Sequence, residues 1–178
     1  KITEIFCSID DFCKEFIPLF EQRLIGKGKK RNKPSKLSLS EVMTIQVLFH
    51  LSGVRTFKKF YLDYVRLHLK DCFPKTVSYN RMVELCSESM VPLLAYLKTQ
   101  GTGHCSGISF IDSTPLRVCH NRRIHSHKVF NGLAQRGQCS IGWFFGFKLH
   151  IVTNDSGQII DLLITPGNND DRTPLRME

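Results

Sequence analysis

The sequence predicts an α+β protein in which a helical bundle is followed by a small antiparallel sheet. Apolar residues recur at intervals of three and four through the first hundred residues, which is typical of helices packed on one face. From Gly107 onward the interval changes to two, which is typical of strands. The composition is 42% hydrophobic and 23% charged, as expected for a globular chain.

The helical part begins with a long amphipathic segment over residues 2–25. Its apolar side chains form one stripe, made of Ile5, Ile9, Phe12, Phe16 and Phe20. Residues 26–36 interrupt the pattern with glycine, proline and lysine, and they are interpreted as a basic linker.

A second helix is predicted from residue 39 to Gly53, because Ser38 and Glu41 have the spacing of a capping box. Residues 57–73 and 78–98 supply two further helical stretches. We therefore expect a compact bundle that ends near residue 100.

Three strands are predicted in the second half. The first is GISFIDS, residues 107–113, and it is followed by a polar excursion. In residues 143–153, Trp143, Phe145, Phe147, Leu149 and Ile151 alternate with Phe144, Gly146, Lys148 and His150. The tight turn Asn154–Gly157 joins them to a third strand over residues 158–165. The glycine-rich stretch between the two halves predicts a helical domain, 1–103, and a sheet domain, 104–178.

The charge favours a polyanionic partner. Lys and Arg number 25 against 16 Asp and Glu, a formal net charge of +9. No acid occurs between Glu21 and Glu41 or between Asp112 and Asp155, and both windows are basic. Nucleic acid is the first expectation, an anionic membrane the second, and a basic protein without such a partner the alternative.

The cysteines predict a reducing compartment. All seven are scattered and none forms a C-x-x-C pair, which fits reduced thiols in a cytoplasmic protein. No apolar stretch has the length of a membrane span, and no signal-peptide pattern opens the chain.

Asp112 is the principal candidate for chemistry. It is predicted to end its strand on the same face as Ile108 and Phe110, where a carboxylate needs a metal ion or a hydrogen-bond network. It could bind Mg²⁺ at a phosphoryl-transfer site, or it could cap the backbone that follows. Lys148 and His150 share the polar face of the second strand, and they could line the same surface as Asp112.

Other chemistries have weaker support. The His and Cys residues between 104 and 139 do not have the spacing of a zinc site. The chain contains no G-x-S-x-G elbow, no G-x-G-x-x-G fingerprint and no Walker loop.

Several blocks in order resemble the DDE transposases of bacterial insertion sequences, in the branch with a short helical N-terminal domain. The blocks are FIDST (110–114), WFFGFKLH (143–150), IIDLLITPGNNDD (159–171), LSLSEVMTIQVLFHLSG (37–53) and SYNRMVEL (78–85).

The resemblance implies an RNase H-like catalytic domain that opens with three antiparallel strands, here incomplete at the C-terminus. It assigns Asp112 as the first catalytic, metal-binding carboxylate, with Mg²⁺ or Mn²⁺ as cofactor. The second catalytic Asp and the Glu of the family lie in blocks that we do not find before Glu178, and Asp171 matches a turn acid that is not catalytic. The chain is therefore expected to be an excerpt of a longer protein or a disrupted remnant.

The resemblance implies cleavage of transposon ends and strand transfer, by a homo-oligomer that holds DNA in the bacterial cytoplasm at the nucleoid. The helical domain, 1–103, is expected to bind the DNA of the transposon ends. Expected phosphate contacts are Arg122, Arg123, Lys128, Lys148, His150, Lys29, Lys30 and Arg31. Two alternatives stay open: a DNA-binding module without catalysis, and an RNase H-like nuclease that acts on RNA.

Overall fold

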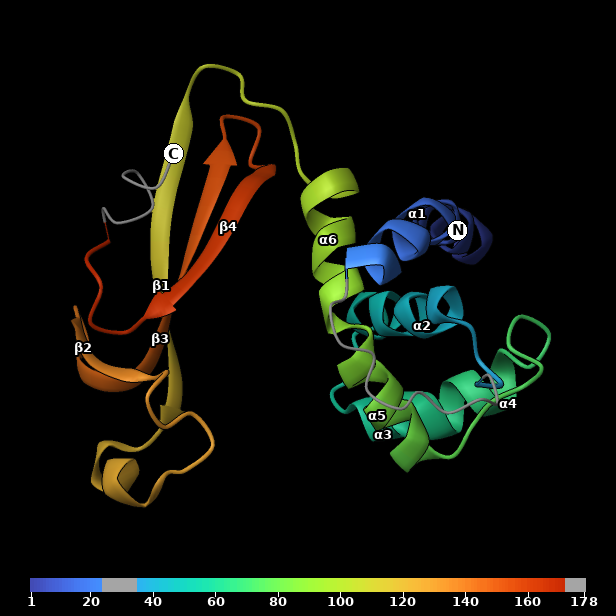
Figure 1. Cartoon of the computed structure of the whole chain (residues 1–178), viewed down its shortest axis with the longest axis horizontal. Helices are drawn as coiled ribbons and strands as arrows, with labels where there is room; N and C mark the ends of the chain where they lie inside the picture. Colours follow the sequence, from blue (N-terminus) through green and yellow to red (C-terminus); the bar gives the residue numbers. More distant parts are fainter. Residues whose placement is uncertain (24–34, 172–178) are drawn as a thin grey trace. The chain divides into compact units, whose positions relative to one another are not determined.

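The computed structural model describes residues 1–23 and 35–171 (Figure 1). The chain divides into two compact units, Lys1–Thr99 and Gln100–Glu178. The first is helical and the second is built on one antiparallel sheet, so the predicted α+β class is confirmed. No helix in the described ranges combines the length and the apolar character that a membrane span needs.

The helical unit follows the predicted order. Its elements are α1 (Ile2–Arg23), α2 (Leu39–Leu51), α3 (Phe57–Lys59), the π-helical turn η1 (Phe60–Val65), α4 (Arg66–His68), α5 (Tyr79–Glu88) and α6 (Met90–Gln100). The three short elements α3, η1 and α4 run on without interruption, so residues 57–68 form one helix with a wide central turn.

The capping box at the start of α2 is present as predicted. The Glu41 backbone N–H donates to Ser38 Oγ at 3.1 Å, and the Ser38 N–H donates to the Glu41 carboxylate at 2.6 Å. Two donors at the helix start are thereby satisfied, and this fixes where α2 begins. The segment 78–98 is divided at Ser89, which separates α5 from α6.

The sheet unit contains β1 (Ser109–Cys119), a 3₁₀ helix η2 (Asn121–Ser126), β2 (Gln135–Cys139), β3 (Gly142–Asn154) and β4 (Ile159–Pro166). The long strand β3 is central. It pairs with β1 on one edge, and on the other with β2 along its first part and with β4 along its second part.

Two features of this sheet differ from the prediction. The first strand does not end at Asp112 but continues through Pro115 to Cys119, and the polar excursion contains the additional strand β2. Pro115 is tolerated because β1 pairs only with β3 in the described part of the chain, so its missing N–H faces an open edge.

The turn after β4 folds back over one face of the sheet. The Gly167 N–H donates to the Gly146 carbonyl at 3.0 Å. A Cβ at Gly137 would overlap the carbonyl oxygen of Gly167, so a glycine is required where the two backbones meet. Residues 166–171 therefore cover side chains of β3 that would otherwise be exposed.

Candidate active site and nucleic-acid interface

Asp112 lies on an open, mostly apolar face of the sheet. It is opposite Ile151 on β3, and its side chain is exposed. Oδ1 accepts a hydrogen bond from the Ser113 N–H at 2.8 Å. Because directly opposite residues of an antiparallel pair share a face, Asp112 lies with Ile151 and, two positions away, with Phe110. The Asp112 carboxylate is thus accessible from solvent beside apolar neighbours.

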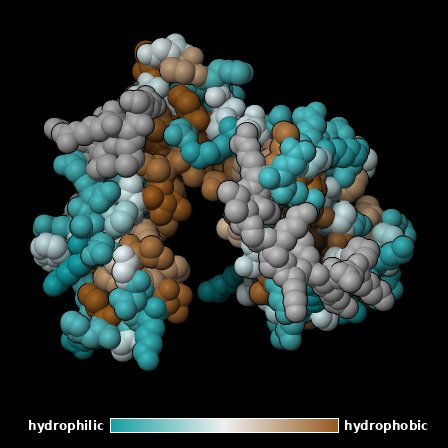
Figure 2. Space-filling view, viewed as in Figure 1, coloured by the Kyte–Doolittle hydropathy of each residue, from teal (hydrophilic) through white to brown (hydrophobic). Residues whose placement is uncertain are grey.

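This apolar face is partly uncovered. Phe110 is 59% exposed, and Ile164 of β4, which pairs with Leu149, is 56% exposed. Figure 2 shows hydrophobic side chains gathered over the strands of this unit. The alternation in residues 143–153 therefore places the more apolar side of β3 on the open face rather than on the buried one.

Lys148 and His150 lie on the face opposite Asp112. In the register of β1 with β3, His150 pairs with Ser113 and Lys148 pairs with Pro115. The expectation that they line one surface with Asp112 is therefore wrong, because adjacent positions on a strand point to opposite faces. His150 is fully buried and Lys148 is 8% exposed, since the turn after β4 covers them.

A polar network holds Lys148 beneath that turn. Its Nζ donates to Asp171 Oδ1 at 2.9 Å and to the Asn169 carbonyl at 2.9 Å. The Ser113 hydroxyl donates to the same Asp171 oxygen at 2.8 Å. The lysine ammonium and the serine hydroxyl hold the pKa of Asp171 below its ordinary value. The network joins β1, β3 and the turn.

His150 forms the second part of this buried region. Its Nε2 and Thr165 Oγ1 are 2.8 Å apart, and Nδ1 is buried without a hydrogen-bond partner among the described residues. Burial lowers the pKa of His150, because the charged imidazolium loses its hydration there. From the sequence, Asp171 was recognised only as a non-catalytic acid in a turn. Its contact with Lys148 depends on a fold-back that no local pattern indicates.

The predicted phosphate contacts near η2 are exposed. Arg122 and Arg123 lie on the 3₁₀ helix and Lys128 follows it, all three open to solvent. Lys29, Lys30 and Arg31 lie outside the described residues.

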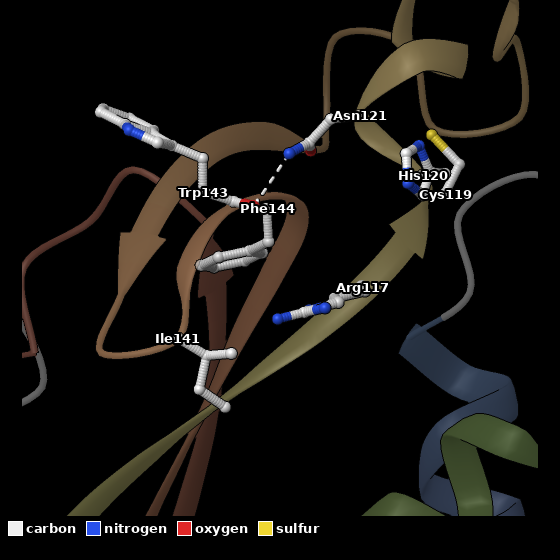
Figure 3. A pocket seen from close by; sticks show the side chains of 7 residues that line it. All are labelled: Arg117, Cys119, His120, Asn121, Ile141, Trp143 and Phe144. Atoms are coloured by element: carbon white, nitrogen blue, oxygen red, sulfur yellow. Dashed lines mark hydrogen bonds between the residues drawn. The ribbon is translucent and has the colours of Figure 1, made fainter.

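A pocket of about 430 Å³ lies where β1 ends and η2 begins. Figure 3 shows its seven lining residues, with the Arg117 guanidinium and the Phe144 ring toward each other and the Trp143 indole directed away. The Asn121 side chain donates to the Trp143 carbonyl at 2.9 Å and ties η2 to β3. The Arg117 guanidinium places a positive charge in the lining of this pocket.

The described residues do not by themselves complete a magnesium site. No three His, Cys, Asp or Glu side chains gather within the described ranges, and Asp112 is a single carboxylate. A Mg²⁺ ion prefers an octahedral set of oxygen ligands, and a two-metal site needs several carboxylates. Asp112 supplies one oxygen ligand of the type that Mg²⁺ prefers, but the described residues do not supply the other ligands.

Comparison with known proteins identifies the sheet unit. Residues 102–178 match the family model of the transposase DDE domain. No curated protein and no solved structure matches the chain closely enough to be compared with it. The matched residues include FIDST, WFFGFKLH and the turn after β4, so the resemblance of these blocks to DDE transposases is confirmed. Residues 102–178 are therefore similar to a transposase DDE domain.

Proposed function

We propose that the chain acts in DNA transposition, as part of an enzyme that cleaves transposon ends and transfers the freed strand to target DNA by phosphoryl transfer. The family match carries this proposal, together with the position of Asp112 on an open face of its sheet. The net charge of +9 supports a polyanionic partner.

In this proposal Asp112 is one ligand of a catalytic divalent cation, Mg²⁺ or Mn²⁺, which would activate water and polarise the scissile phosphate. The remaining ligands would come from outside the described residues. Asp112 is suited to the role because its carboxylate is exposed and fixed by a hydrogen bond from the Ser113 backbone. The network on the opposite face would hold β1 in register through the Ser113 hydroxyl.

We propose Arg122, Arg123 and Lys128 as contacts to DNA phosphates on the sheet unit, because all three are exposed. Lys148 and His150 are assigned a structural role instead, since buried side chains offer no surface to a phosphate. A homo-oligomer would be needed to hold two transposon ends at once.

A test uses a plasmid on which a marker is flanked by the DNA that borders this coding sequence in its genome, with the complete coding sequence supplied in trans. Asp112→Asn should abolish excision, because the amide is a poor ligand for Mg²⁺. Asp155→Asn, which changes an exposed acid in the β3–β4 turn, is the matched control and should retain excision. Undiminished excision by Asp112→Asn would refute the assignment.

A DNA-binding role without catalysis is the second candidate. It is favoured by the single carboxylate at the candidate site. The same assay separates the two roles, because a binding module would give no excision even with Asp112 intact.

A further inference from the structure

Acidic and basic residues are unevenly distributed over the helical unit. Acidic residues are frequent on α1 and α5, and the cations Lys14 and Arg81 of these helices form ion pairs with them. Lys14 lies 2.8 Å from Asp10 on α1, and Arg81 lies 2.8 Å from Glu84 on α5. Lys14 and Arg81 therefore offer little free positive charge to a polyanion.

Residues 55–75 are instead rich in basic residues. They contain six lysines and arginines against two aspartates, Asp63 and Asp71. The six cations are Arg55, Lys58, Lys59, Arg66, Lys70 and Lys75, and all are exposed. Within the described part of the chain none of the six forms an ion pair, although Lys58 lies over the Tyr79 ring at 5.9 Å.

The backbone that carries these cations is a helix–turn–helix. Helix α2 ends at Leu51, and Gly53 takes a left-handed φ of 68° in the turn, which favours glycine. The second helix, residues 57–68, packs on α2 through aromatic contacts. Phe49 lies 5.3 Å from Phe57 and 5.6 Å from Phe60 between ring centroids.

One side of the second helix is anchored in the core and the other is open. Phe60, Tyr61 and Val65 are buried, and the Tyr61 hydroxyl donates to the Val77 carbonyl at 2.8 Å. Lys59 and Arg66 are exposed on the same helix. They flank the π-helical turn η1, Lys59 directly before it and Arg66 directly after it. The buried side chains of this helix hold the backbone that carries both cations in place.

We infer that this surface, defined by Arg55, Lys58, Lys59 and Arg66, binds the sugar-phosphate backbone of duplex DNA. The inference rests on the proposed function and assigns the DNA contact of the helical unit to residues that the sequence did not single out. Clustered like charges repel one another, and a polyanion relieves this repulsion while releasing its counterions. DNA is taken as the partner because the proposed function is DNA transposition.

Asp63 provides an internal check, because it is an exposed carboxylate on the same helix. It repels phosphate, so Asp63→Asn should tighten binding while Lys59→Gln and Arg66→Gln weaken it. Opposite effects from neighbouring positions are not expected from a general loss of structure.

The experiment measures fluorescence anisotropy of a labelled 20-base-pair DNA duplex with the full chain, over a range of salt concentrations. The Lys59→Gln/Arg66→Gln variant should weaken binding. Its slope of log K against log salt should be smaller by about 1.8, because each phosphate that a cation neutralises contributes about 0.9 to the slope. Lys14→Gln is the matched control on α1, and it should leave the slope unchanged. Far-UV circular dichroism checks that each variant is folded.

The outcomes separate this inference from the proposed function. If the unchanged chain does not bind duplex DNA, or binds the matching RNA duplex more tightly, the DNA partner itself is wrong. If the unchanged chain binds DNA but the double variant keeps both affinity and slope, the surface is wrong and the proposed function stands.

Discussion

Lys148 Nζ lies 2.9 Å from Asp171 Oδ1, and the same oxygen accepts a hydrogen bond from the Ser113 hydroxyl at 2.8 Å. This one carboxylate oxygen therefore connects the central strand, an edge strand and the turn after β4. The lysine side chain is 10% exposed and the aspartate side chain 61%, so solvent screens this ion pair mainly at the aspartate.

Lys148→Met should destabilise the sheet unit by about 1–2 kcal/mol, because it removes two hydrogen bonds beneath the turn while the exposed aspartate regains water. The free energy of unfolding can be followed in urea by fluorescence of Trp143, the only tryptophan. Lys128→Met removes an exposed cation from the same unit and should change stability by less than about 0.5 kcal/mol. Equal stability of both variants would show that the pair contributes nothing.

The sheet unit should lose stability in acid in two steps. Burial lowers the folded pKa of His150 below its ordinary value of 6.5, so its contribution is complete above pH 6.5 and is lost as the pH falls through the folded value. The pKa of Asp171 is lowered from 3.8, so the stability from its ion pair is lost below that pH. Lys148 and Asp171 are the charged groups that act on His150, with opposite effects.

The first step can be measured as the difference in unfolding free energy between pH 7.5 and pH 5.5. His150→Gln should reduce this difference, whereas His125→Gln, which removes an exposed imidazole from η2, should preserve it. A difference that is unaffected by His150→Gln would assign the acid sensitivity to another group.

Gly137→Ala should destabilise the sheet unit by about 1–3 kcal/mol, because its Cβ would overlap the Gly167 carbonyl and push the turn off the sheet. Gln138→Ala changes the next residue, which is exposed, and should have little effect. Urea unfolding monitored at Trp143 compares the two. A stable Gly137→Ala protein would mean that the turn does not lie as closely on β2 as described.

Tyr61→Phe should destabilise the helical unit by about 1–2 kcal/mol. The hydroxyl donates to the Val77 carbonyl at 2.8 Å and accepts from the Val77 N–H at 3.1 Å, so its loss leaves both backbone groups without this partner. Circular dichroism at 222 nm follows the unfolding of the helices. Tyr64→Phe removes the hydroxyl of a tyrosine that is 45% exposed, and it should be neutral.

The helices were predictable because their determinants are local. The stripe of α1 and the reciprocal bonds of Ser38 and Glu41 involve residues only three or four positions apart. The strand β3 and its turn to β4 were predictable for the same reason, since the period of two in β3 and the sequence Asn154–Gly157 are short-range signals.

The rest of the sheet depends on distant partners. Gln135–Cys139 is polar and contains a glycine, and it becomes a strand only because it pairs with the start of β3. The continuation of β1 beyond Pro115 depends on its position at an edge. The burial of Lys148 requires a turn more than twenty residues away, so alternation alone could not show which face of β3 is covered.

The most direct test of the central claim is whether Asp112 binds a divalent cation. Paramagnetic broadening of backbone amide signals by Mn²⁺, measured by NMR on the full chain, locates any bound ion. We predict broadening centred on Asp112 and Ser113, abolished in Asp112→Asn and retained in Asp155→Asn. Broadening that is centred elsewhere, or that is unchanged in Asp112→Asn, would contradict the assignment of Asp112 as the metal-binding carboxylate.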